Sequence, residues 1–142
     1  FGSNAAGFVI MAQVNARLVL RGGPALWLRR MVLVYLASGL CLLALALWQP
    51  AELWPLLIPL FICVASLGCV LPNATACAMA GQGRHAGSAS GLLGSMQFSV
   101  AASASALVAF LHDGSAMPMA LVIALCGAGA CGFAWWSKRF VV

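Results

Sequence analysis

Charged side chains are scarce in this sequence. Lysine, arginine, aspartate and glutamate together make up 6% of its 142 residues, whereas 64% of the residues are apolar. A soluble domain normally carries about 25% charged residues, because its surface has to be solvated by water. The composition therefore excludes an ordinary soluble globular protein and indicates a chain that lies in the hydrocarbon of a lipid bilayer.

Acidic residues are especially rare. Glu52 and Asp113 are the only two, and both fall in short polar breaks between apolar runs, as do the two histidines, His85 and His112. No carboxylate or imidazole is expected inside a membrane span, so the sequence predicts no proton relay within this chain. It also shows no nucleophile, base and orienting group at catalytic spacing, and we expect no enzymatic activity, cofactor or bound metal.

Cysteine pairs and nucleotide-binding loops are missing as well. The six cysteines form no C-x-x-C pair and all lie within apolar runs, so we interpret them as small packing residues rather than disulfides or ligands. Residues 81–86 formally fit a dinucleotide-binding pattern, but no strand precedes them. In residues 87–91 the serines occupy the second and fourth places, whereas a hydrolase elbow requires the third.

Long apolar runs are what the sequence has in abundance. Short polar breaks separate five of them: residues 1–16, 31–48, 54–79, 87–111 and 117–136. Helix is the expected state, because a backbone in lipid must satisfy its hydrogen bonds internally and these runs do not alternate as barrel strands do. The predicted fold is therefore an all-α integral membrane protein with about five transmembrane helices.

The first run is short, covering about 24 Å of a hydrocarbon core about 30 Å thick. The chain also begins at Phe1 rather than at a methionine. We therefore interpret it as a piece of a longer protein and expect further spans upstream. No basic segment precedes the first run, so we do not interpret it as a cleaved signal peptide.

Basic residues occur on alternate connections between the runs. Residues 17–30 carry four arginines, residues 80–86 carry Arg84, and the tail carries the remaining two basic residues, Lys138 and Arg139. The connections at 49–53 and 112–116 carry none. The positive-inside rule then predicts that the basic connections and the C-terminus are cytoplasmic. The net charge of +5 thus serves orientation, and the expected surroundings are membrane lipids rather than nucleic acid.

Three neutral amides inside the runs are candidates for a substrate cavity: Asn4, Asn73 and Gln97. An amide in hydrocarbon needs a partner, so each forms an interhelical hydrogen bond or lines a wetted cavity. Asn73 has a further possibility, since Pro72 is expected to kink its helix and to free the carbonyl of Gly68. Asn15 lies near the inner boundary, where contacts with the loop would suffice.

The run at 87–111 has two distinct faces. Gly87, Gly91 and Ser95 recur at four-residue spacing, which predicts close packing against another helix. Gln97 lies near the centre of the span on roughly the opposite face, which it shares with small residues. One helix is therefore expected both to pack and to line a cavity.

Four short stretches stand out by their order and spacing: Phe1-x-x-Asn4, N-A-R-L-V-x-R-x-G at 15–23, P-N-A-T-A at 72–76, and G-S-A-S-G-L-L-G-x-x-Q at 87–97. Together they resemble the C-terminal half of the Bcr/CflA drug-resistance transporters of the major facilitator superfamily. The resemblance implies that the five runs are helices eight to twelve of a twelve-helix transporter, and so most of its C-terminal six-helix bundle.

The same resemblance implies proton-coupled drug efflux across a bacterial inner membrane by alternating access. It places Asn4 and Gln97 on the cavity wall and Pro72 and Asn73 at a gating kink. Arg17 and Arg21 would help to close a cytoplasmic gate, although the acid usual in that loop is absent. Expected partners are the missing N-terminal half, a small-molecule drug and protons, whose coupling residues would lie in that half.

Two other functions remain open on the sequence. Neutral amides and small residues do not specify one ligand, so a major facilitator exporter of sugars or metabolites fits the same pattern. A small membrane subunit that does not transport, and acts by helix association, fits as well.

Overall fold

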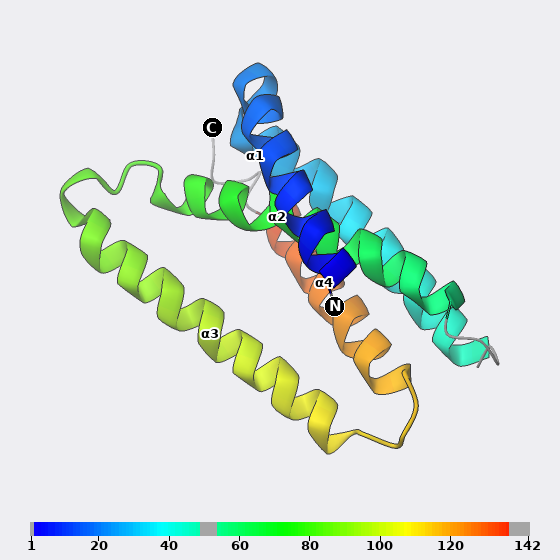
Figure 1. Cartoon of the computed structure of the whole chain (residues 1–142). Helices are drawn as coiled ribbons and strands as arrows, with labels where there is room; N and C mark the ends of the chain where they lie inside the picture. Colours follow the sequence, from blue (N-terminus) through cyan, green and yellow to red (C-terminus); the bar gives the residue numbers. More distant parts are fainter. Residues whose placement is uncertain (1, 49–53, 137–142) are drawn as a thin grey trace.

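The computed structural model describes residues 2–48 and 54–136. Within them the chain forms four α-helices and no strand (Figure 1): α1 (Gly2–Trp48), α2 (Trp54–Met79), α3 (Ala86–Phe110) and α4 (Met117–Trp136), with the short 3-10 helix η1 (Gly83–His85) before α3. All four α-helices are long and apolar enough to cross a membrane. The expected all-α membrane fold is therefore confirmed, and the chain is a multi-pass membrane protein.

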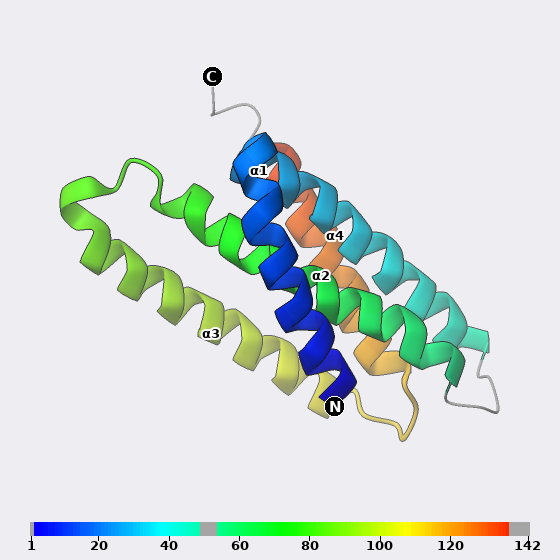
Figure 2. The same ribbon diagram turned by 45° about the horizontal axis from the view of Figure 1, so that its top comes forward.

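A sharp turn at Gly23 divides α1 into two arms. Gly23 has φ 72° and ψ 161°, a backbone conformation that is essentially restricted to glycine. Pro24 follows, and proline fits the first position of a helix because its missing N–H needs no partner there. The arms, residues 2–22 and 24–48, both run away from this turn in Figures 1 and 2, dark blue and cyan respectively.

The turn corrects our expectation of a loop at residues 17–30. The structure keeps these residues helical on both sides of Gly23, so the runs at 1–16 and 31–48 lie in the two arms of one helix. The physical reason is that only the Gly-Gly-Pro step at 22–24 breaks the helix, since leucine and arginine are good helix formers. Arginines can remain helical near a membrane boundary because their long side chains reach the water.

The first arm of α1 and α2 cross at very short range. A Cβ atom added to Gly68 would overlap the carbonyl oxygen of Phe8 and lie 3.1 Å from the backbone nitrogen of Ala12. One added to Gly7 would lie 2.6 Å from the ring of Phe61. Small residues at such a crossing allow the two backbones to approach, which is how helices commonly associate in membranes.

The second arm of α1 packs against α4. Leu42, Ala46 and Ala120 form a fully or nearly fully buried cluster between them. Further along the same contact, a Cβ atom at Gly127 would lie 3.2 Å from the Cα atom of Leu36. The first arm, the second arm, α2 and α4 thus form one packed group of helical segments.

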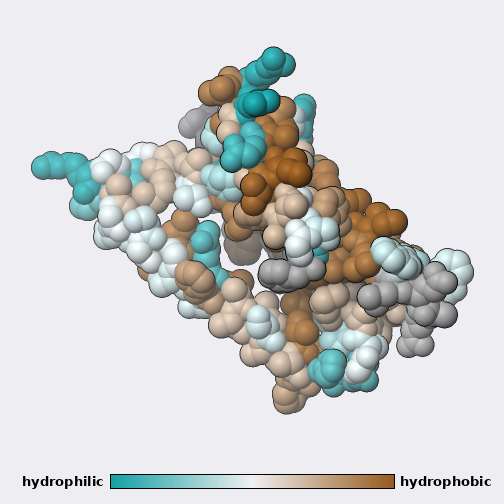
Figure 3. Space-filling view, in the orientation of Figure 1, coloured by the Kyte–Doolittle hydropathy of each residue, from teal (hydrophilic) through white to brown (hydrophobic). Residues whose placement is uncertain are grey.

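The helix α3 stands apart from this group. None of its residues is buried, and Figures 1 and 2 both show it separated from the other helices along most of its length. The space-filling view in Figure 3 shows the open gap directly. No described atom outside the helix lies within 4 Å of a Cβ atom built at Gly87 or Gly91, and Ser95 is exposed. Close packing on this face stays a prediction.

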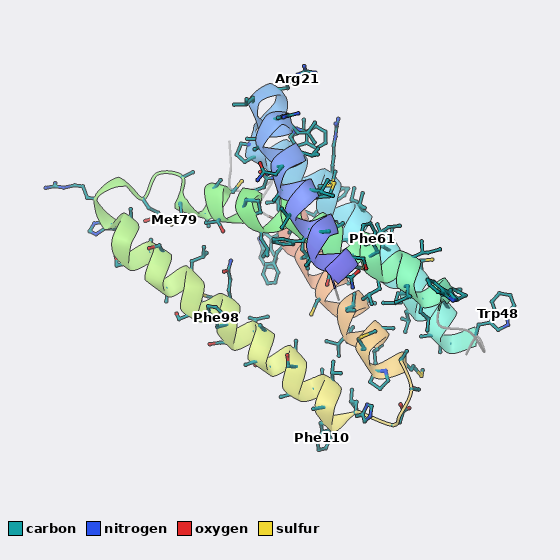
Figure 4. The ribbon with its side chains drawn as sticks, viewed as in Figure 1. Arg21, Trp48, Phe61, Met79, Phe98 and Phe110 are labelled. Atoms are coloured by element: carbon teal, nitrogen blue, oxygen red, sulfur yellow. The ribbon has the colours of Figure 1, made fainter. Side chains whose placement is uncertain are left out.

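The ends of the helices separate by charge. Arg21 lies at the turn of α1, and Met79 ends α2 towards the connection that carries Arg84 (Figure 4). Trp48 and Phe110 lie at the far ends of their helices (Figure 4). The described arginines therefore belong to one end of the molecule, as alternation of the connections requires. Glu52, Lys138 and Arg139 lie outside the described residues.

The turn at Gly23 gives a direct test of the fold. A Gly23→Ala substitution in the complete protein should destabilise it by about 1–3 kcal/mol, because alanine is strained at this φ and ψ. The matched control is Gly129→Ala in α4, where the added methyl group meets open space. Thermal unfolding in detergent should show a lower midpoint for the first variant alone, and equal midpoints would contradict the turn.

Candidate functional site

Asn15 and Asn73 form a buried pair between the first arm of α1 and α2. The side-chain nitrogen of Asn73 donates to Oδ1 of Asn15 over 2.7 Å, and the nitrogen of Asn15 donates to Oδ1 of Asn73 over 3.4 Å. Asn15 is only 5% exposed and Asn73 only 2%. Each amide thus supplies the donor and the acceptor that the other needs in an apolar environment.

This pair accounts for the side-chain hydrogen bonds of Asn73 in the described conformation. Its side-chain hydrogen bonds are made with Asn15, and not with the Gly68 carbonyl that Pro72 leaves without its usual partner. Its burial also means that it does not line an open cavity here. The sequence singled out Asn73 but assigned Asn15 to loop contacts, so the pairing was missed.

Pro72 immediately precedes Asn73, and α2 remains helical through both Pro59 and Pro72. One turn earlier on each helix, the thiol of Cys69 donates to the backbone carbonyl of Met11 over 3.4 Å. Together with the close approach at Gly68, these contacts tie α2 to the first arm on both sides of the proline. Pro72 therefore lies in a segment of α2 that is packed against the first arm of α1 and bonded to it.

A second polar contact joins α2 to the other arm of α1. Ser38 Oγ lies 3.0 Å from Cys63 Sγ and donates to the carbonyls of Val34 and Tyr35 over 2.9 and 3.0 Å. Ser38 and Cys63 are 7% and 2% exposed. The helix α2 is thus bonded to both arms through neutral groups, which need no counter-ion in hydrocarbon.

Asn4 and Gln97 are placed differently from Asn73. Asn4 is half-buried near the start of α1, and Gln97 is exposed on α3. Among the described residues neither side chain makes a hydrogen bond, and no such bond joins the three candidate residues. Gln97 faces open space because α3 is unpacked, so its amide is accessible to a ligand or to another helix.

The two candidate gate arginines lie where the first arm ends. Arg17 and Arg21 are exposed, and both line a shallow depression on the helix with Val14, Leu18 and Leu20. Figure 4 shows Arg21 at the tip of α1. No ion pair is formed within the part of the chain that the structure describes. Both guanidinium-bearing side chains are therefore accessible from outside the helix.

Asp113 is the one carboxylate within the described ranges, and it lies outside the helices. The hydroxyl and the backbone N–H of Ser115 donate to it over 2.6 and 2.9 Å. These hydrogen bonds hold the pKa of the Asp113 carboxyl below its usual value, so it is ionised at neutral pH. The described parts of the helices carry no carboxylate.

The asparagine pair can be tested by a double-mutant cycle. Asn15→Leu and Asn73→Leu should each cost about 1–3 kcal/mol of stability, because each leaves one buried amide without its partner. The double variant should cost less than the sum by about 0.5–2 kcal/mol, the range for hydrogen bonds between membrane helices. Unfolding of the complete protein in mixed micelles measures all four states, and strictly additive losses would contradict the pair.

Comparison with known proteins places this geometry in context. The chain is 29% identical over 126 residues to a bicyclomycin resistance protein homolog of Haemophilus influenzae, a match that covers 89% of the chain and 31% of that protein. The chain thus spans less than a third of the relative's length. No protein-family profile and no solved structure matches it. The similarity supports the resemblance to drug-resistance transporters only loosely.

Proposed function

We propose that this chain forms part of a proton-coupled drug exporter of the major facilitator kind in a bacterial inner membrane. The observation that carries the proposal is its similarity to a bicyclomycin resistance protein homolog across 89% of its length. The four apolar helices support it, because a multi-pass bundle is what such a transporter requires. The proposed substrates are small amphipathic drugs, a class suggested by the bicyclomycin resistance relative and compatible with neutral candidate ligand groups in apolar surroundings.

The substrate path runs beside Asn4 and Gln97. Both amides are free of hydrogen bonds to described residues, and so both retain donors and acceptors for a drug. Asn73 takes a different role, because its amide is already bonded to Asn15. We place it with Pro72 at a joint, where α2 and the first arm of α1 move as one body during alternating access.

The exporter needs more chain than these 142 residues. The unpacked face of α3, with Gly87, Gly91 and Ser95, offers a small-residue surface for helices of the missing N-terminal half. That half also supplies the coupling carboxylate, because the sole described carboxylate, Asp113, lies in a connection. The matched relative is about three times as long as the region it shares with this chain, which leaves room for such a half.

The arginine-bearing ends face the cytoplasm in this proposal. The positive-inside rule favours that orientation for the turn of α1, for the Arg84 connection and for the C-terminus. Arg17 and Arg21 then lie at the cytoplasmic entrance, where they close the gate by bonding to helix ends or acids of the other half. Their exposure and lack of a described ion-pair partner support this role.

Export is tested by expressing the complete protein in a drug-sensitive bacterium and measuring minimal inhibitory concentrations and dye efflux. We expect resistance from the complete protein, none from residues 1–142 alone, and a loss of about 2–10-fold for Gln97→Ala, the equivalent of one neutral hydrogen bond. Gln82→Ala, an exposed glutamine in the turn after α2, is the matched control.

Three results would count against the proposal or one of its parts. Resistance from residues 1–142 alone would show that no second half is needed. Absence of drug resistance from the well-expressed complete protein, with export of a sugar or metabolite instead, would assign a different cargo. Equal losses for the variants of Gln97 and Gln82 would remove Gln97 from the substrate path.

A further inference from the structure

Two apolar grooves meet at Arg29, at the arginine-bearing end of the molecule. The larger, of about 460 Å³, lies between the second arm of α1, α2 and α4. The smaller, of about 200 Å³, lies between the second arm and α4. Arg29, Val32 and Ala134 line both grooves, so the two grooves share a wall that carries one arginine.

The depth of the larger groove corresponds to one leaflet of a membrane. Its wall on α2 extends from Val70 to Ala78, next to the end of that helix. Eight residue steps of helix span about 12 Å, close to half of a hydrocarbon core about 30 Å thick. The groove also reaches the surface, because Phe133 on its α4 side is 75% exposed. It therefore has the depth and the access that an acyl chain needs.

Arg29 is distinguished from the arginine next to it. The guanidinium of Arg30 lies 5.3 Å from the centroid of the Trp27 ring, in a cation–π contact, and Arg30 lines neither groove. Arg29 is half-buried between the grooves. The described carboxylate, Asp113, precedes α4, whereas the grooves lie near the other end of that helix. Within the described chain the charge of Arg29 has no acidic partner.

We propose that these grooves bind one anionic phospholipid, with its phosphate on Arg29 and its two acyl chains in the two grooves. The charges are complementary, since a phosphate supplies the counter-ion that Arg29 lacks among the described residues. Basic pockets between membrane helices commonly hold anionic head groups. The walls come from the second arm, α2 and α4, and none from the first arm or α3, so the site is separate from the proposed drug path.

The proposal is tested by native mass spectrometry of the complete protein, purified in detergent and offered dioleoyl phosphatidylglycerol or dioleoyl phosphatidylcholine. We expect one tightly retained phosphatidylglycerol, and an apparent affinity about fivefold lower in Arg29→Gln, as expected for one arginine near an anionic lipid. Arg30→Gln removes the same charge one residue away and should keep the tight site. Arg29→Lys should also largely retain it.

A second variant keeps the test decisive if Arg29→Gln fails to fold. Ala130→Phe fills the larger groove and leaves Arg29 in place, so it should abolish tight binding of the long-chain lipid. Equal retention of phosphatidylcholine and phosphatidylglycerol would overturn the proposal. Equal loss in the Arg29 and Arg30 glutamine variants would overturn it too, because it would indicate a diffuse charge effect. Unchanged binding in Ala130→Phe would likewise remove the acyl-chain site.

Discussion

The structure depends on one constraint, which is that a backbone in hydrocarbon must satisfy its hydrogen bonds within its own helix. The chain meets it with long apolar helices and keeps every described charge close to a helix end or in a connection. The buried polar side chains Asn15, Ser38, Ser66 and Asn73 are neutral, and Asn15 and Asn73 bond to each other. Side-chain hydrogen bonds between helices are few as a result, and each of them fixes a particular pair of segments.

The helix α2 is the member that these bonds hold most firmly. It contacts the first arm of α1 through Asn73, Cys69 and Gly68, and the second arm through Cys63. The helix α3 has no such partner and buries no residue. The open face of α3 is therefore the surface that we propose for helices of a second half.

Much of the fold follows from the sequence because apolar runs long enough to cross a bilayer can only be helices. The turn in α1 was predicted less accurately. The arginines suggested a loop across residues 17–30, whereas a single Gly-Pro step bends the chain. Asn15 and Asn73 are 58 positions apart, and nothing local predicts that they share a depth and a face. The larger groove at Arg29 is lined by the second arm of α1, α2 and α4. The sequence of any one of these segments does not predict that the other two lie beside it.

The central claim is that the helices cross the membrane alternately with their arginine-bearing ends in the cytoplasm. Single cysteines replacing Arg84 and His112, in the complete protein without its native cysteines, can be labelled with a membrane-impermeant thiol reagent in right-side-out and inverted vesicles. The account predicts that position 112 reacts only in right-side-out vesicles and position 84 only in inverted ones. Reaction of both positions from the same side, or the reverse sidedness, would contradict it.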